Sequence, residues 1–331
     1  MLARVLIGAC LACFISNQAI AQSEISVPSD TKFVVKLDLA AFGETEIGAK
    51  IVQVTKEMAQ AELGEDEDAM MEKIIETVGF DPLEEVKSMT IMGLDYERPE
   101  KGMRMMLQLG NTAGNLEGLA LTLPNYQAEE VGGYTIHSAH EDKMKAFATI
   151  HTGSTGAKTV VVATSKEDLV GMLDSLKSSA PSSLQEAKAA QGPRQISWTV
   201  PTGTFAQVHV LEMPGEMMKG GPQANIAKLV SDLSLTVGES EDQIEVSVAL
   251  TAANEKKAEQ LRQLAQGAKA MISLFQDEVK GDEEAEMAME ILKKVTIEQD
   301  GSTLMLHVEI PQELIMVQIS DNGGLSIEAD L

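Results

Sequence analysis

The stretch Phe33-Val34-Val35-Lys36-Leu37-Asp38-Leu39 decides the fold of the first half of the chain. Phe33, Val35, Leu37 and Leu39 recur at every second position, which predicts a strand with one buried face and one polar face. The strand is introduced by the turn-forming residues Val27-Pro28-Ser29-Asp30-Thr31. We therefore expect a β-sheet with Val35 and Leu37 pointing into its core.

This opening recurs in the second half of the chain. The segment Val200-Pro201-Thr202-Gly203-Thr204 resembles the turn at residues 27–31, and Val208-His209-Val210 resembles Val35-Lys36-Leu37. Further strands and helices follow in a similar order after each copy. The sequence thus predicts two related α+β halves, each a ferredoxin-like strand-helix-strand-strand-helix-strand unit with an extra hairpin.

The remaining elements follow from hydrophobic periodicity and from turn signals. We expect further strands at residues 88–94, 104–109, 133–137, 145–151, 159–164, 205–211, 231–237, 243–251, 295–298 and 303–310. Helices are expected at residues 51–58, 71–78, 115–123, 165–176 and 254–275, with a shorter one around 287–292. Ser165-Lys166-Glu167-Asp168 has the pattern of a capping box. In the last strand, Leu304 and Val308 take the core face, so His307 is expected to face solvent.

The halves are separated by a stretch rich in Ser, Ala, Pro and Gln at residues 178–192. Such a composition is typical of a linker. We therefore divide the chain into residues 1–21, an N-terminal domain at 22–177, a linker at 178–195 and a C-terminal domain at 196–331.

The first 21 residues have the pattern of a secretory signal. Arg4 precedes an apolar run at residues 5–15, and Ala19-Ile20-Ala21 is a small-x-small cleavage site, so we expect cleavage after Ala21. Both cysteines, Cys10 and Cys13, would be removed, which predicts a periplasmic or extracellular protein without disulfides. The alternative is a lipoprotein signal with lipid attached to Cys10.

Acidic residues dominate the charged side chains. The chain has 26 Lys and Arg, 51 Asp and Glu and a net charge of −25, and removal of Arg4 makes it more negative still. This charge argues against binding to nucleic acid. The apolar run at residues 5–15 is shorter than the roughly 20 residues of a membrane span. The expected partner is a cationic protein, or the envelope held through divalent cations.

Several generic segments give the chain a wider resemblance. They are residues 33–39, Phe80-Asp81-Pro82-Leu83, Thr90-Ile91-Met92-Gly93, Gly133-Tyr134-Thr135-Ile136, residues 165–173 and residues 254–264. With these segments the chain resembles a family of uncharacterised secreted proteins of planctomycete-type bacteria. The resemblance implies a tandem α+β exported protein, and it supplies no catalytic residues.

Two groups of side chains could hold a metal ion. His137, His140 and His151 could bind zinc or copper together with Glu141 or Asp142, although an odd spacing places His137 and His140 on opposite faces of a strand. The thioethers of Met213, Met217 and Met218 are suited to Cu(I). Ordinary surface and core roles are the simpler interpretation of both groups.

Other familiar motifs are incomplete. In Gly153-Ser154-Thr155-Gly156-Ala157-Lys158-Thr159, Ala157 separates the glycine from the lysine, so we expect a hairpin turn and not a phosphate-binding loop. The acidic runs at residues 62–72 and 277–286 lack the ligand pattern of an EF-hand. No G-x-S-x-G motif occurs, and aromatic residues make up only 3% of the chain, which argues against stacking on sugars.

These observations favour a noncatalytic, exported, acidic protein that binds or scaffolds a partner and holds no cofactor. A periplasmic copper- or zinc-handling protein is the first alternative. An enzyme of unidentified class is the second.

Overall fold

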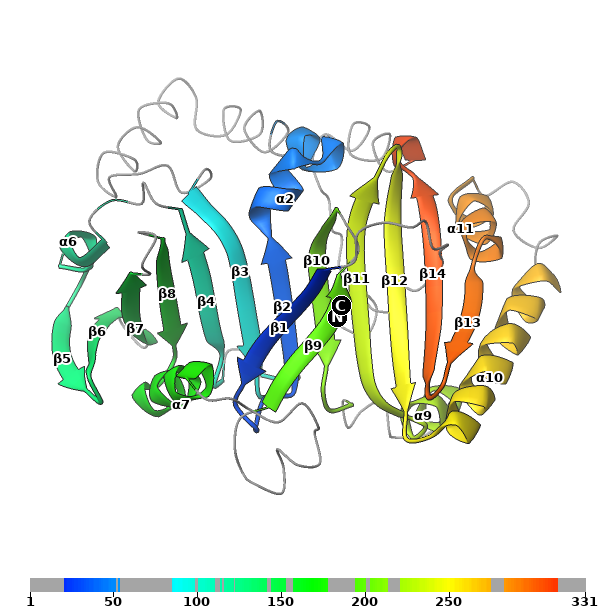
Figure 1. Ribbon diagram of the computed structural model, residues 1–331. Coiled ribbons are helices and arrows are strands. Elements are labelled where there is room, and N and C mark those ends of the chain that lie inside the picture. Colours follow the sequence, from blue (N-terminus) through cyan, green and yellow to red (C-terminus); the bar gives the residue numbers. More distant parts are fainter. Residues whose placement is uncertain are drawn as a thin grey trace. The chain divides into compact units, whose positions relative to one another are not determined.

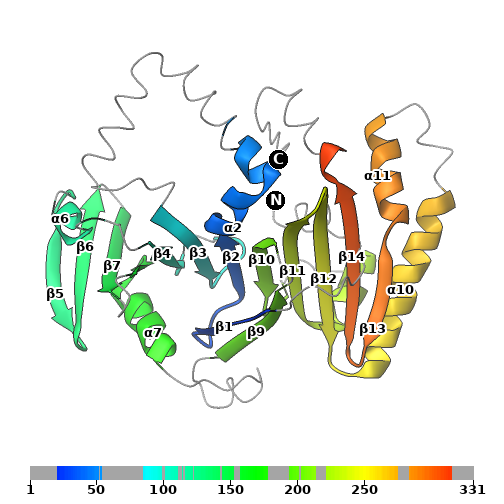
Figure 2. The ribbon, with the colours of Figure 1, turned by 45° about the horizontal axis from the view of Figure 1, so that its top comes forward.

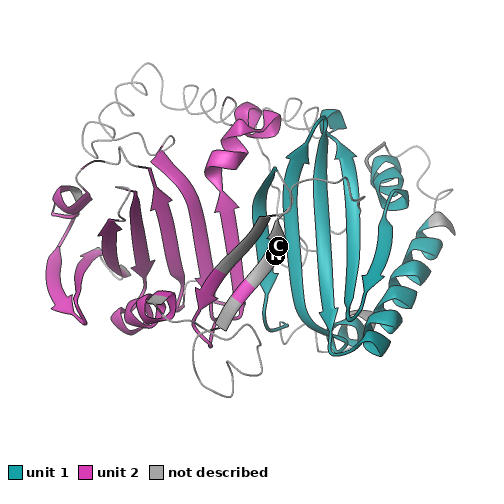
Figure 3. Cartoon of the chain, in the orientation of Figure 1, with its two compact units in different colours: residues 1–21, 200–331 teal, residues 22–199 magenta. Residues whose placement is uncertain are grey.

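The structure is a computed structural model of the chain, and its described part forms two compact units (Figure 3). It describes residues 21–51, 53, 85–98, 101–110, 114, 116–121, 123–141, 144–152, 157–177, 194–200, 203–213, 221–274 and 283–314. One unit, here called the N-terminal unit, contains residues 22–199. The C-terminal unit contains residues 200–331 together with residues 1–21. The predicted helix at 71–78 and the stretch 178–192 lie outside the described residues.

The N-terminal unit is built on an antiparallel sheet (Figure 1). Its strands are β2 (Phe33–Asp38), β3 (Val86–Gly93), β4 (Arg104–Leu109), β5 (Gln127–Val131), β6 (Tyr134–Glu141), β7 (Met144–Thr152) and β8 (Lys158–Ala163). They lie in the order β2-β3-β4-β8-β7-β6-β5. The helices are α2 (Leu39–Glu44), α6 (Leu116–Ala120) and α7 (Lys166–Lys177). A separate two-stranded sheet joins β1 (Ala21–Val27) to β9 (Arg194–Val200), and this pair was not predicted.

The C-terminal unit repeats this plan with longer helices. Its strands are β10 (Thr204–Val210), β11 (Val230–Ser240), β12 (Gln243–Ala252), β13 (Thr296–Asp300) and β14 (Thr303–Pro311), in the order β10-β11-β12-β14-β13. The helices are α9 (Gly221–Ala227), α10 (Glu255–Leu274) and α11 (Glu283–Lys293). Helix α10 contacts β12, β13, β14 and α11, which can be followed in Figure 1 and Figure 2.

The α+β class is confirmed, but the ferredoxin-like arrangement of the halves is wrong. In a split β-α-β unit another strand lies between the two strands that the first helix joins. Here β2 pairs directly with β3, and β10 pairs directly with β11, both antiparallel. Both units instead share a meander of three strands closed by a hairpin, β7-β8 in one unit and β13-β14 in the other.

The two units differ in what is inserted between the third strand and this hairpin. In the C-terminal unit the insertion contains α10 and α11. In the N-terminal unit it contains α6 and the strands β5 and β6, which extend the sheet. A helix pair, of which α10 contacts the sheet, is therefore replaced by additional sheet in the other unit.

The core of the C-terminal unit lies between its sheet and α10. Leu304 of β14 is fully buried, and it belongs to one cluster with Ala258 and Leu261 of α10. Leu233 and Leu250 contact the same cluster from the sheet. One face of this sheet is therefore apolar, and α10 covers it with the apolar side of an amphipathic helix.

Within the described ranges, none of the helices combines the length and the apolar content that crossing a bilayer requires.

Candidate functional site

Both faces of the N-terminal sheet carry apolar side chains on the central strands. The side chains of one face are buried, and those of the other are partly exposed. On the buried face lie Val34, Thr90, Met92, Met106, Ile136 and Val161. Helix α7 contacts β4, β7 and β8, and its Leu169 and Met172 are completely buried. This face therefore forms the core of the unit together with α7.

The opposite face carries ten apolar side chains that are all partly exposed. They are Val35, Leu37, Met89, Ile91, Met105, Leu107, Ala148, Ile150, Val160 and Val162, and we call this surface the open face. Strand pairing arranges them in two rows across β2, β3, β4, β8 and β7. One row runs Val35, Ile91, Met105, Val162, Ala148, and the other runs Leu37, Met89, Leu107, Val160, Ile150.

The open face corresponds to the helix-covered face of the C-terminal unit. The sequence repeat matches Val35 and Leu37 with Val208 and Val210, which pair with Leu235 and Leu233 of β11. Leu233 contacts the cluster that includes the α10 residues Ala258 and Leu261. Because α6, β5 and β6 take the chain position of α10 and α11, the N-terminal unit has no such helix pair in the described insertion.

This arrangement corrects one prediction. Val35 and Leu37 were expected to lie in the core, but both side chains are partly exposed. The side chain of Val34, on the opposite face of the same strand, is fully buried. Strand β2 presents apolar side chains on both faces, so alternation alone identified the wrong one. The side that α7 covers decides which face is the core.

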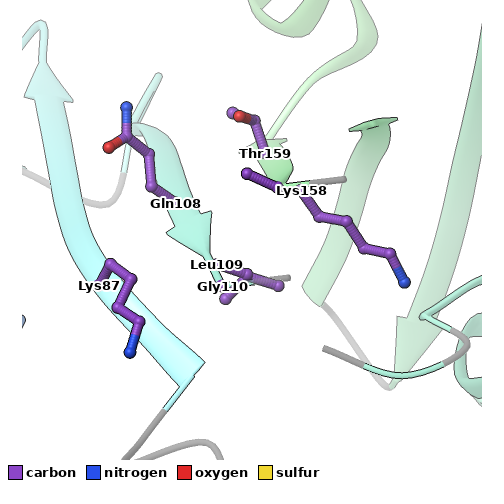
Figure 4. Close-up of a pocket in the computed structure, with 7 residues that line it drawn as sticks. Lys87, Gln108, Leu109, Gly110, Lys158 and Thr159 are labelled. Carbon is purple, nitrogen blue, oxygen red and sulfur yellow. The ribbon is translucent and has the colours of Figure 1, made fainter. Parts of the chain in front are cut away.

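A pocket of about 520 Å³ lies at the end of the open face (Figure 4). It is lined by Lys87, Gln108, Leu109, Gly110, Ala157, Lys158 and Thr159. Lys158 follows the side of Val160 and Val162 along β8, and it pairs with Leu109 of β4. Lys87 occupies an irregularity in β3 between Val86 and Ser88. Figure 4 shows the two lysine side chains pointing away from those of Gln108 and Thr159.

The lining of this pocket contains two ammonium groups and no carboxylate. Lys158 Nζ donates a hydrogen bond to the carbonyl of Gly114. Gln108 Oε1 accepts from the Ser88 hydroxyl at 3.0 Å on the opposite side of the sheet. One carboxylate lies nearby, since a Cβ atom on Gly110 would come within 2.4 Å of Glu85 Oε2.

A buried arginine fixes α7 on the other face. The Arg104 side chain is 4% exposed. Its Nη1 donates to Asp30 Oδ1 at 2.8 Å, and its Nη2 donates to Asp30 Oδ2 at 2.9 Å and to Asp168 Oδ1 at 2.7 Å. The hydrogen bond from Arg104 lowers the pKa of Asp30, although burial opposes this effect. Burial lowers the pKa of Arg104, but its bonds to Asp30 and Asp168 more than compensate and raise it.

The N-cap half of the predicted capping box is confirmed at the start of α7. The backbone N–H of Asp168 donates to Ser165 Oγ at 3.1 Å, and the Ser165 hydroxyl donates to Asp168 Oδ2 at 2.5 Å. The sequence identified this cap but not its link to Arg104, which lies 64 positions away in the chain. An arginine at the start of an otherwise apolar strand was the available signal.

The candidate histidine ligands are not brought together. His137 is buried, and its Nδ1 lies 2.8 Å from the Tyr126 hydroxyl, with the two rings stacked. The regular β6–β7 register places His140 on the other face, as expected. His151 is exposed near the far end of β7. Among the described residues there is no group of three or more His, Cys, Asp or Glu side chains that could hold a metal ion.

The methionine candidates are placed only in part. Met213 is partly buried against the apolar cluster beneath α10, which is a core position. Met217 and Met218 lie outside the described residues, as does Asp142.

The incomplete phosphate-loop motif ends at the start of β8. Lys158 begins β8, and β8 pairs with β7 from Thr152 opposite Lys158, so a strand and not a helix follows the lysine, as predicted. In the C-terminal unit, β13 and β14 pair as a hairpin whose turn contains Gly301 at φ +54°.

His307 lies on the polar face of the C-terminal sheet, opposite the buried Leu304 and Val308 as expected, but it is only partly exposed. Its Nδ1 shares a hydrogen bond of 2.6 Å with the Ser247 hydroxyl, and burial lowers its pKa to about 4. Beside this pair, Glu245 lies opposite Glu309. Burial raises the pKa of Glu245, the nearby charge of Glu309 adds to the rise, and a hydrogen bond from Ser240 opposes it.

The lowered pKa of His307 predicts a pH-dependent stability. Between about pH 6.5 and pH 4 the unfolded chain binds a proton at this histidine that the folded chain does not, so the free energy of unfolding should fall as the pH decreases. We expect a contribution of roughly 1 kcal/mol, because partial exposure screens the effect. Urea unfolding at pH 7 and pH 5 measures it. His307→Gln should reduce the pH dependence, and an unchanged pH dependence would contradict the assignment.

No known family model matches the sequence, and no curated protein matches it significantly. Among solved structures, crystal form III of TP0453 is similar over 89% of this chain and 98% of that protein, with 11% identity and a TM-score of 0.41. Crystal form I of TP0453 gives 90% and 97% coverage, 10% identity and a TM-score of 0.38. Neither similarity is large enough to place the chain in a family.

Proposed function

We propose that this chain is a noncatalytic, exported binding protein whose binding surface is the open face. The observation that carries the proposal is the partial exposure of ten apolar side chains on five neighbouring strands. Contiguous apolar patches larger than a few hundred Å² are rare on monomeric proteins, and they mark interaction sites. Export rests on the signal pattern before Ala21, and cleavage there would leave residues 22–27 of β1.

A comparison of the exposed sheet faces of the two units supports the open face as a binding surface. The face of the C-terminal sheet that points away from α10 carries Thr236, Ser247 and His307 in one row across three strands. A polar face of this kind is the ordinary solution for a sheet surface in contact with water. The open face has the opposite composition, although water would favour polar side chains there.

The proposal does not require catalytic groups. Ser247 and His307 form a serine–histidine pair on the polar face of the C-terminal sheet. With a pKa of about 4, His307 is a weak base, so a structural role accounts for the pair better than catalysis.

Leu107→Asn tests the binding surface, because Leu107 lies on the central strand of the open face. An apolar fluorescent dye should bind the wild-type protein, and this substitution should weaken binding about tenfold or more, since it places an amide within the patch. Leu264→Asn is the matched control, because Leu264 is 47% exposed on α10 and lies outside the open face. Absence of dye binding, or equal losses in both variants at unchanged stability, would refute the proposal.

A further inference from the structure

We propose that Met89 and Met105 on the open face are a modification site for hydroperoxides, and that their oxidation to sulfoxides weakens binding at this surface. This inference rests on the proposed function and specifies its regulation. Both side chains are partly exposed, on the inner strands β3 and β4 of the sheet. The other side chains of the open face are Val, Leu, Ile and Ala, so methionine is the residue type there that an oxidant converts from apolar to polar.

Strands β3 and β4 each carry one methionine on each face of the sheet. Met89 and Met105 lie on the open face, whereas Met92 and Met106 lie on the buried face that forms the core with α7. The side chains of Met92 and Met106 are 0% and 9% exposed, so a peroxide reaches their sulfur atoms only when the structure opens. Met89 and Met105 contact solvent in the folded state. The fold therefore directs oxidation to the open face.

The surroundings of the two exposed methionines make the sulfoxide unfavourable for binding. Their cross-strand neighbours are all aliphatic, and these are Leu37 and Leu107 beside Met89, and Ile91 and Val162 beside Met105. None of these four side chains can donate a hydrogen bond to a sulfoxide oxygen. The oxygen must keep its bound water, whereas an apolar ligand has to displace water from this surface. Oxidation therefore opposes the step on which apolar binding depends.

The reaction requires only a hydroperoxide as the second reactant. The thioether sulfur attacks the terminal oxygen of the hydroperoxide, so the O–O bond breaks and an S–O bond forms. The sulfur loses two electrons, and the peroxide is reduced to the alcohol, or to water when it is hydrogen peroxide. The proton of the transferred hydroxyl group moves to the departing oxygen.

The sequence pattern of an exported protein favours methionine as the site of oxidation. Cys10 and Cys13 lie in the signal pattern before Ala21, so cleavage there would leave thioethers as the oxidisable sulfur of the mature chain. Export would also take the chain away from the thiol systems that keep the cytosol reducing.

The test is to treat the full chain with hydrogen peroxide, to locate sulfoxides by tandem mass spectrometry of its peptides, and to titrate the apolar dye. Met89 and Met105 should react about tenfold faster than Met92 and Met106, because the buried pair reacts only in opened molecules. Dye affinity should fall about tenfold or more once both exposed sulfurs are oxidised. Urea unfolding should keep nearly the same midpoint, which shows that the loss does not come from unfolding.

Three variants separate the site from other methionines. Met89→Leu/Met105→Leu keeps both side chains apolar and of similar volume, so it should bind the dye as the wild-type protein does and keep this affinity after peroxide treatment. Met89→Gln/Met105→Gln places amides at both positions, and it should bind about tenfold more weakly without any oxidant. Met305→Leu is the matched control, because Met305 is 37% exposed on the polar face of the C-terminal sheet. This variant should still lose dye binding on oxidation.

Several results would overturn the modification site. They are equal reaction rates for the exposed and buried methionines, unchanged dye affinity once Met89 and Met105 are sulfoxides, and loss of dye binding on oxidation of the leucine variant. In each case, dye binding by the untreated protein that depends on Leu107 would leave the proposed function standing. Absence of dye binding before oxidation would remove both.

Discussion

Replacing Arg104 with alanine is expected to lower the free energy of unfolding by about 3 kcal/mol. The substitution leaves the Asp168 carboxylate, which is 19% exposed, without its cation, and it removes the tie between β4 and α7. Removal of one partner of a buried pair costs about 3 to 5 kcal/mol. We expect the lower end because Asp30 is half exposed and stays hydrated. Urea unfolding at pH 7 gives the value.

Arg98→Ala is the control for this experiment. Arg98 is 60% exposed and its bond to Asp95 is 3.4 Å long, so its loss should cost no more than about 0.5 kcal/mol. The pKa of Asp30 is lowered in the folded protein, so the stability it contributes is present at neutral pH and is lost as the pH falls below about 4. Similar losses for Arg98 and Arg104 would show that the buried network is not a major source of stability.

Leu304→Ala is expected to destabilise the C-terminal unit by about 3 kcal/mol. Leu304 is fully buried between β14 and α10, in contact with the cluster of Ala258 and Leu261. Truncation of a buried leucine removes apolar contacts and leaves a cavity, at a cost of about 2 to 5 kcal/mol. Thermal and urea unfolding of the full chain would measure the loss.

The neighbouring residue serves as the control, since adjacent residues of a strand point to opposite faces. Met305 is 37% exposed on the polar face, so Met305→Ala should change the free energy of unfolding by less than about 1 kcal/mol. If both substitutions cost the same, the assignment of the helix-covered face as the core of this unit would be wrong.

The strands that could be predicted are those with a strong apolar pattern. Both ends of the strand at residues 104–109 were predicted correctly. The strands predicted at 243–251 and 303–310 each end one residue before the observed strands β12 and β14. The short strand β5 was missed because its sequence is Gln-Ala-Glu-Glu-Val and its first four side chains are exposed. β1 and β9 were missed because they flank segments that composition marks as a signal and a linker.

The order of the strands and the position of the open face could not be predicted from the sequence pattern. Periodicity states that a strand has an apolar face, but β2 and β4 have two, as Val34 and Val35 or Met105 and Met106 show. Which face becomes core depends on where α7 packs, and the bonds that link α7 to β4 through Arg104, Asp30 and Asp168 join residues far apart in the chain. Lys158 attracted attention as part of an incomplete phosphate loop, whereas its position at the end of the open face required the register of β4 and β8.

The exposed strand β5 has a consequence for solubility at high concentration. It is the last strand in the order of its sheet among the described residues, and a strand at the edge of a sheet is a template for addition of further strands and for fibril growth. Glu129 and Glu130 lie in the middle of this edge, one ion-paired with Lys166 at 2.7 Å and the other accepting a hydrogen bond from Thr135 at 2.6 Å. Two like chains approaching through β5 would bring these carboxylates together, so the acidic edge protects the chain against aggregation.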